Sequence, residues 1–114
     1  MSRPSGAALA QARSAAPLFA ALGDQTRLQL LLQLSRLGPG SIASLSADAV
    51  VSRQAVTKHL RILADAGYVQ GERVGREHLW RLKPERLQDA QAWLERISAE
   101  WDEALGRLKH FVEG

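Results

Sequence analysis

With 114 residues, 46% of them hydrophobic and 24% charged, the chain has the length and composition of one globular domain. It contains no cysteine, which excludes disulfides, thiolate metal sites and cysteine-based redox switches. No apolar run reaches the ~18 residues of a membrane span, and Arg3 and Pro4 are followed by no long apolar core of a signal peptide. We therefore expect a cytoplasmic protein.

The net charge of +3 is unevenly distributed. Residues 1–83 carry eleven Lys and Arg against five Asp and Glu, a balance of +6, whereas residues 84–114 carry four against seven, a balance of −3. A basic body followed by an acidic segment is typical of a nucleic-acid-binding face with a separate role for the other end. Chance clustering on a solvated surface is the alternative.

The first predicted element is an alanine-rich helix over residues 7–22. Residues 1–6 are expected to be disordered, and residues 7–114 to form a single domain. Pro17 lies inside the helix, where a proline removes a backbone hydrogen bond, so a kink or a restart is expected there. One face of this helix carries Leu18, Phe19 and Leu22.

Two shorter helices are predicted next. Gly23 ends the first helix, and Asp24 is a good N-cap for a second one, because its carboxylate can accept from a free backbone N–H. The buried side of this second helix is expected to carry Leu28, Leu31 and Leu32. Gly38-Pro39-Gly40 is a strong stop. A short helix then begins at the cap Ser41 and ends near Ala47 or Asp48.

Residues 52–66 are the most informative part of the chain. Ser52 is a good N-cap, and Gly67 ends the helix where a left-handed residue is needed. One narrow apolar stripe is formed at i, i+4 and i+7 by Val56, Leu60 and Leu63. The opposite face carries side chains of the types that contact base edges and phosphates: Ser52, Arg53, Gln54, Thr57, Lys58 and Arg61. Together with the short helix before it, this pattern predicts a helix-turn-helix pair with its recognition helix second.

After Gly67 the pattern changes to that of strands, and residues 68–82 are predicted to form a hairpin. Its strands are expected over 68–73 and 78–82, joined by Val74-Gly75-Arg76-Glu77. A basic hairpin directly after a recognition helix predicts a wing that contacts phosphates or the minor groove through Arg73, Arg76 and Arg81. The alternative is a hairpin that only completes the core, and both roles can coexist.

Pro84 opens the last predicted helix, over about residues 84–112. Its apolar residues recur every seven positions in two series, Leu87, Leu94, Trp101, Leu108 and Ala90, Ile97, Ala104, Phe111. A seam of about four heptads on a helix of roughly 45 Å exceeds what one small core needs. We expect the N- and C-terminal helices to form a homodimer interface that includes Leu18, Phe19, Leu87, Leu94, Ile97, Trp101 and Leu108. The alternative is that the seam packs only within its own chain.

Over nearly all of residues 15–112 the chain resembles the ArsR/SmtB family of small dimeric winged-helix repressors. The likeness is carried by residues 19–28 (FAALGDQTRL, with Gln25 where a proline is common), 52–60 (SRQAVTKHL), 67–69 (GYV) and 73–76 (RVGR). The resemblance implies a mainly α winged helix-turn-helix fold with a small β-hairpin. It also implies that Arg76 contacts the flanking backbone and that the major groove is read by Arg53, Gln54, Thr57 and Lys58.

The metal sites of this family are not matched. One of them needs cysteines, which are absent. The other uses an Asp-x-His pair and a His-x-x-Glu pair; residues 110–113 match the second by spacing, but the first falls on Ile97-Ser98-Ala99, which cannot bind Zn²⁺. We therefore expect no metal and no cofactor, as in an autorepressor-like member of the family that needs no ligand. A small apolar effector pocket lined by Phe19, Trp93 and Trp101 stays open as an alternative.

No arrangement of nucleophile, base or paired carboxylates indicates catalysis, so no catalytic residue is named and an enzyme is not expected. His59 and His78 have no ligand partner at suitable spacing and are expected to face DNA or to pack. The sequence therefore predicts a homodimeric, sequence-specific repressor that binds an inverted repeat of double-stranded DNA, in its own or a neighbouring operon. The alternatives are a winged-helix protein-interaction module, or the same repressor gated by a small-molecule or metal effector. Seven Lys and Arg against three Asp and Glu over residues 52–83 favour DNA.

Overall fold

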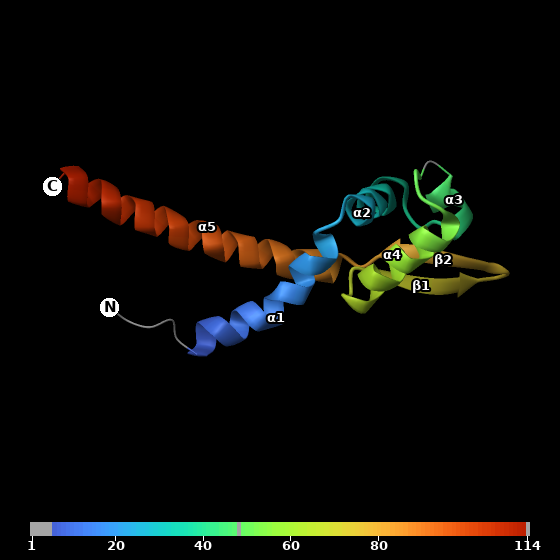
Figure 1. Cartoon of the computed structure of the whole chain (residues 1–114), viewed down its shortest axis with the longest axis horizontal. Coiled ribbons are helices and arrows are strands. Elements are labelled where there is room, and N and C mark those ends of the chain that lie inside the picture. Colours follow the sequence, from blue (N-terminus) through green and yellow to red (C-terminus); the bar gives the residue numbers. More distant parts are fainter. Residues whose placement is uncertain (1–5, 48, 114) are drawn as a thin grey trace.

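The computed structural model describes residues 6–47 and 49–113. The elements follow one another as α1 (Gly6–Leu22), α2 (Gln25–Leu37), α3 (Ile42–Ser46), α4 (Arg53–Asp65), β1 (Val69–Val74), β2 (Glu77–Leu82) and α5 (Pro84–Glu113). Helices α2, α3 and α4 gather with the hairpin into a body, from which α5 projects with α1 beside its first part (Figure 1). The predicted mainly helical fold with one small hairpin is confirmed.

Helix α1 continues through Pro17 without the predicted restart. Pro17 and Arg13, whose carbonyl loses its hydrogen bond to position 17, are both exposed, so that carbonyl can bind water instead. Gly6 already lies in α1, contrary to its expected disorder, and the rest of that predicted segment, residues 1–5, lies outside the described residues.

The three predicted N-caps are confirmed. Asp24 Oδ2 accepts from the backbone N–H of Arg27 at 3.0 Å. Ser41 Oγ accepts from the N–H of Ser44 at 3.1 Å, and Ser52 Oγ accepts from that of Ala55 at 3.2 Å. Because each cap satisfies an N–H that the helix itself leaves free, α2, α3 and α4 begin directly after these residues. Helix α3 ends at Ser46, one residue before the predicted range; Asp48 lies outside the described residues.

The core lies between α2, α3, α4 and the hairpin. Its most buried side chains are Leu30, Leu34, Leu45, Val56, Leu60, Leu63, Tyr68, Val69 and Trp80. The predicted stripe of α4 is confirmed, but Leu28 and Leu32 of α2 are 51% and 48% exposed, so their predicted burial is wrong. The leucines of α2 spread over a wide arc of the helix, and Leu28 and Leu32 lie at one edge of it; the centre of the arc packs against α4 and β2.

The hairpin pairs from Val69↔Leu82 to Val74↔Glu77, so its turn has two residues, Gly75 and Arg76, instead of the four predicted. Gly75 has φ 64° while Arg76 does not have a positive φ, which is the geometry of a type II′ turn. This tight turn matches the twist of the two strands. Strand β2 also exchanges two hydrogen bonds with Gly40, through the N–H and C=O of Trp80 at 2.8 and 3.0 Å.

Tyr68 lies just before β1 and is fully buried, although it was predicted to begin the strand. Its hydroxyl donates to the carbonyl of Leu18 at 2.8 Å, which ties the end of α1 to the hairpin. Burial raises the pKa of this hydroxyl, so it stays protonated and keeps donating across the ordinary pH range.

Helix α5 begins at Pro84 as predicted, and its two halves have different surroundings. Leu87 packs against the core and Ala90 is buried. Farther along, the ring of Trp93 meets that of Phe19 edge to face at 6.4 Å, and Arg96 Nη1 donates to Gln11 Oε1 at 3.4 Å. Beyond these contacts with α1 the helix is largely exposed. Over the described ranges, no helix is long and apolar enough to cross a membrane.

Candidate nucleic-acid interface

Helix α4 has one fully buried face and one open face. Val56, Leu60 and Leu63 are inaccessible to solvent. On the other side, Gln54, Thr57, Lys58 and Arg61 line a shallow hollow of about 510 Å³, and Arg53 is exposed in the first turn. The structure therefore brings the predicted base-reading side chains together on one surface.

The basic side chains on this surface have no acidic partner. Within residues 6–47 and 49–113, no ion pair involves Arg53, Lys58 or Arg61. Thr57 Oγ1 donates to the carbonyl of Arg53 at 2.9 Å, which leaves the hydroxyl oxygen free to accept. The hydroxyl oxygen of Ser52 caps the helix, and its hydrogen remains available as a donor. The open face of α4 therefore offers donors and acceptors together with uncompensated positive charge.

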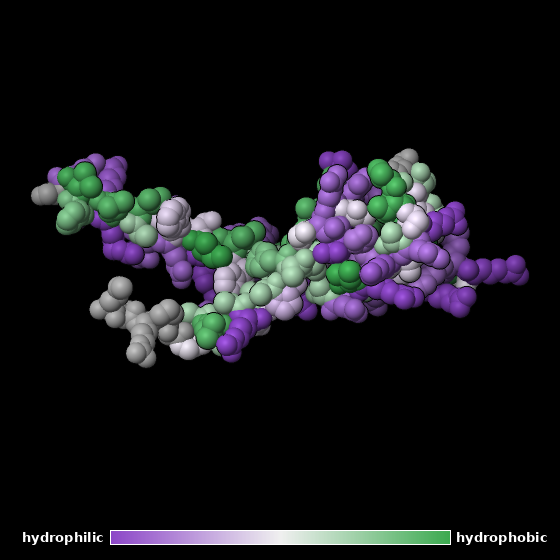
Figure 2. All heavy atoms as spheres, viewed as in Figure 1, coloured by the Kyte–Doolittle hydropathy of each residue, from purple (hydrophilic) through white to green (hydrophobic). Residues whose placement is uncertain are grey.

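The wing carries two exposed arginines, Arg73 on β1 and Arg76 in the turn. The end of the hairpin forms a hydrophilic projection (Figure 2). Arg81 is exposed as well, but its Nη2 donates to Gln70 Oε1 at 3.0 Å and its Nε lies 3.6 Å from Glu72 Oε2. Arg81 thus pairs with the neighbouring strand, whereas no ion pair in the described residues involves Arg73 or Arg76.

Both histidines near the interface pack within the protein. The ring of His78 stacks on that of Trp80, with centroids 5.1 Å apart and planes at 17°. His59 points from α4 toward the start of α2, where its Nδ1 lies 3.2 Å from Arg27 Nη1 and 3.7 Å from Asp24 Oδ2. Of the two roles predicted for these residues, packing is the one observed. No role was predicted for Arg27, since a contact across 32 positions leaves no periodic signal in the sequence.

Asp24 provides a prediction for pH dependence. The hydrogen bond from the backbone of Arg27 lowers the pKa of Asp24, and the charge that His59 carries when it is protonated acts in the same direction, as does the charge of Arg27. A lowered pKa means that ionised Asp24 stabilises the fold above the usual carboxylate range, and that this stability is lost as the pH falls through the folded pKa. We expect wild type to lose stability relative to Asp24→Asn as the pH falls from about 5 to about 2.

The measurement is urea unfolding of both proteins over this pH range. The variant is a matched control, because asparagine is also a good N-cap but does not titrate. If the free energies of unfolding of the two proteins changed in parallel with pH, the charge of Asp24 would not stabilise the fold.

The predicted dimer seam divides into a covered part and a free part. Leu18 and Leu87 pack against the core of their own chain, and Phe19 packs against Trp93. The alternative of packing within the chain therefore describes this part. The free part is exposed on α5, where apolar side chains follow the helix away from the body (Figure 2). Its members from the predicted seam are Leu94, Ile97, Trp101, Leu108 and Phe111, and the neighbouring Leu105 and Val112 extend it; all seven are between 46% and 83% exposed.

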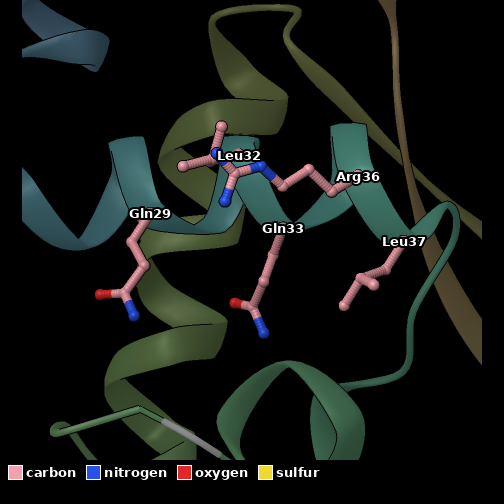
Figure 3. Close-up of a pocket in the computed structure, with 5 residues that line it drawn as sticks. All are labelled: Gln29, Leu32, Gln33, Arg36 and Leu37. Atoms are coloured by element: carbon pink, nitrogen blue, oxygen red, sulfur yellow. The ribbon is translucent and has the colours of Figure 1, made fainter.

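The effector pocket that was left open as an alternative, lined by three aromatic side chains, is not assembled within this chain. Phe19 and Trp93 touch directly, while Trp101 lies two turns farther along α5 and is 65% exposed. A hollow of about 390 Å³ does lie on the outer face of α2, lined by Gln29, Leu32, Gln33, Arg36 and Leu37 (Figure 3). All five side chains come from one helix, so a ligand would find no opposing wall. In the described part of the chain, no group of three or more His, Asp or Glu side chains could hold a metal ion.

Comparison with known proteins agrees with this geometry. Residues 24–70 match the family described as bacterial regulatory protein, arsR family. The chain is 34% identical over 85 residues to the uncharacterized HTH-type transcriptional regulator YuzN of Bacillus subtilis, which covers 68% of this chain and 92% of that protein.

Two solved structures share the fold. An ArsR-like transcriptional regulator from Rhodococcus sp. RHA1 has a TM-score of 0.78 and 40% identity, covering 90% of this chain and 95% of that one. A homodimeric winged helix-turn-helix DNA-binding domain from Mycobacterium bovis has a TM-score of 0.64 and 22% identity, covering 88% and 92%. The chain therefore belongs to the ArsR family and is a winged helix-turn-helix transcriptional regulator that binds DNA, and not an enzyme.

Proposed function

We propose that the protein is a cytoplasmic, homodimeric repressor that binds an inverted repeat in the promoter of its own or a neighbouring operon. The observation that carries this proposal is the open face of α4, where three cations that have no acidic partner among the described residues lie opposite a fully buried apolar stripe. In the proposed complex this face enters the major groove, and Arg73 and Arg76 of the wing contact the flanking backbone or minor groove.

Individual roles follow from position along α4. The first turn of a recognition helix contacts base edges, and Arg53 and Gln54 lie there. A guanidinium can donate two hydrogen bonds to guanine, and an amide can pair with adenine. Thr57, Lys58 and Arg61 continue the same face toward the end of the helix, with Ser52 at its start.

Arg53→Ala is expected to reduce discrimination between operator and scrambled duplex by about 1–3 kcal/mol, because it removes a bidentate contact to one base pair. Fluorescence anisotropy on both duplexes gives this ratio. Arg76→Ala is the matched control and should weaken binding to both duplexes alike, since a backbone contact carries no direct sequence information. An unchanged ratio for Arg53→Ala would remove its base-reading role.

The proposed partner that supplies the second recognition helix is another copy of the chain. The free apolar part of α5 has no cover within the described residues, and a seam with a seven-residue repeat is suited to another helix of the same kind. A two-fold dimer presents two copies of α4 to two half-sites, which is why an inverted repeat is the proposed target. The domain from Mycobacterium bovis that shares this fold is itself a homodimer.

Salt titration with DNA from upstream of the gene tests the proposal as a whole. Affinity that comes from phosphate contacts should fall steeply between about 50 and 200 mM salt. If no binding were detected at low micromolar protein, or if the affinity did not change with salt concentration, the protein-interaction alternative would be favoured instead.

A further inference from the structure

A chain of hydrogen bonds joins the end of α1 to the middle of α4, and Arg27 lies at its centre. Arg27 Nε donates to the carbonyl of Ala21 at 2.6 Å, and Nη2 donates to that of Ala20 at 3.3 Å. Its Nη1 lies 3.2 Å from Nδ1 of His59. Because a guanidinium has only donors, Nδ1 of His59 accepts this bond, and the neutral ring carries its hydrogen on Nε2.

Asp24 holds the other side of the same chain. Its Oδ2 accepts from the backbone N–H of Arg27 at 3.0 Å and lies 3.7 Å from Nδ1 of His59. The side chains of His59 and Asp24 are 21% and 34% exposed, so the bond from Arg27 to His59 lies partly out of water, where hydrogen bonds are stronger than at the surface. The first turn of α2 thus connects the last turn of α1 to the recognition helix.

The apolar contacts of α4 do not fix its orientation by themselves. Burial of Val56, Leu60 and Leu63 holds the helix against the core, but apolar attraction is non-directional and tolerates small rotations. Hydrogen bonds weaken steeply when their angle changes. The contact between Arg27 and His59 is therefore a directional restraint between α4 and the helices that precede it.

We propose that Arg27 and His59 form a positioning pair that sets the orientation of α4 relative to α1, and with it the half-site spacing that the dimer accepts. The inference rests on the proposed function, because only a dimer has two half-sites. Helix α1 packs on α5 through Phe19 and Trp93, so α1 is attached to the proposed dimer helix. The hydrogen-bond chain then transmits the dimer geometry to each recognition helix.

The test measures spacing preference, which a merely structural residue would not alter. An inverted repeat is selected from random duplexes with the wild-type protein, and versions are made with the half-sites one and two base pairs farther apart. Wild type should prefer the selected spacing by about tenfold or more. His59→Leu removes the acceptor and should lower that preference to about threefold or less. His59→Asn can place an amide oxygen where Nδ1 lies and should restore it.

Two further variants separate positioning from stability. Ile62→Val loosens the packing of α4 without touching the hydrogen-bond chain and should keep the wild-type spacing preference. Arg27→Lys keeps the charge but loses the planar fork, so it should also lower the spacing preference to about threefold or less. This variant tests the positioning pair if His59→Leu fails to fold. Unchanged spacing preference in folded His59→Leu or Arg27→Lys would overturn the positioning role. If selection with the wild-type protein yielded no inverted repeat, that result would overturn the proposed function and the positioning role with it.

Discussion

Trp101→Glu is expected to convert the dimer to a monomer and to weaken binding to the inverted repeat by about 10²–10⁴-fold. Trp101 is 65% exposed within its own chain, so the change removes no core contact there. In the proposed dimer the same change places a carboxylate in an apolar seam, where it must lose water without gaining a partner. A monomer then binds each half-site separately and loses the high effective concentration of the second site.

Light scattering gives the mass of the variant, and fluorescence anisotropy gives its affinity for the repeat. Glu103→Gln is the matched control, since it lies two residues along α5 and hence on the opposite face of the helix. This control should remain a dimer with wild-type affinity. A Trp101→Glu protein that stays dimeric would place the subunit contact elsewhere.

Leu60→Ala is expected to reduce the free energy of unfolding by about 2–5 kcal/mol, because it leaves a cavity in the centre of the core. Leu60 is inaccessible to solvent and packs in the cluster that joins α2, α4 and the hairpin. A small domain has a total stability of only about 5–15 kcal/mol, so this loss is a large share of it. Urea unfolding at one fixed protein concentration measures it, since assembly also contributes to stability.

The neighbouring residue supplies the contrast. Arg61 is exposed on the open face, so Arg61→Ala should change the free energy of unfolding by no more than about 0.5 kcal/mol. The same substitution should weaken DNA binding, whereas Leu60→Ala should still bind at temperatures where it is folded. If both substitutions destabilised the fold equally, the division of α4 into a core face and a reading face would be wrong.

The parts of the fold that sequence reasoning predicted are those fixed by local chemistry. Asp24, Ser41 and Ser52 act as caps through hydrogen bonds only three residues long, and the stripe of α4 follows from one helical period. The buried face of α2 was predicted wrongly in part, because Leu28 and Leu32 lie at one edge of a wide arc of leucines whose centre packs against the core. Of the kink or restart predicted at Pro17, the restart does not occur, because an exposed carbonyl can bind water in place of the missing N–H.

The candidate site shows the same division between local and distant information. The open face of α4 was predictable, since residues on one helix share a face at fixed spacing. The pairing of Arg81 was not predictable, because its partners Gln70 and Glu72 lie across the hairpin and depend on its register. The contact of Arg27 with His59 spans 32 positions. The covered part of the α5 seam likewise depends on α1, whose Gln11 meets Arg96 across 85 positions.

The free apolar part of α5 has a consequence for how the proposed repressor responds to its own abundance. If subunits associate only through this exposed surface, the population of dimers at low abundance rises with the square of the monomer concentration. Operator occupancy would then rise more steeply than for a protein that binds as a single unit. In a gene that the protein itself represses, such a response would sharpen the level at which synthesis stops. The length and apolar content of one projecting helix would thus set a threshold for expression.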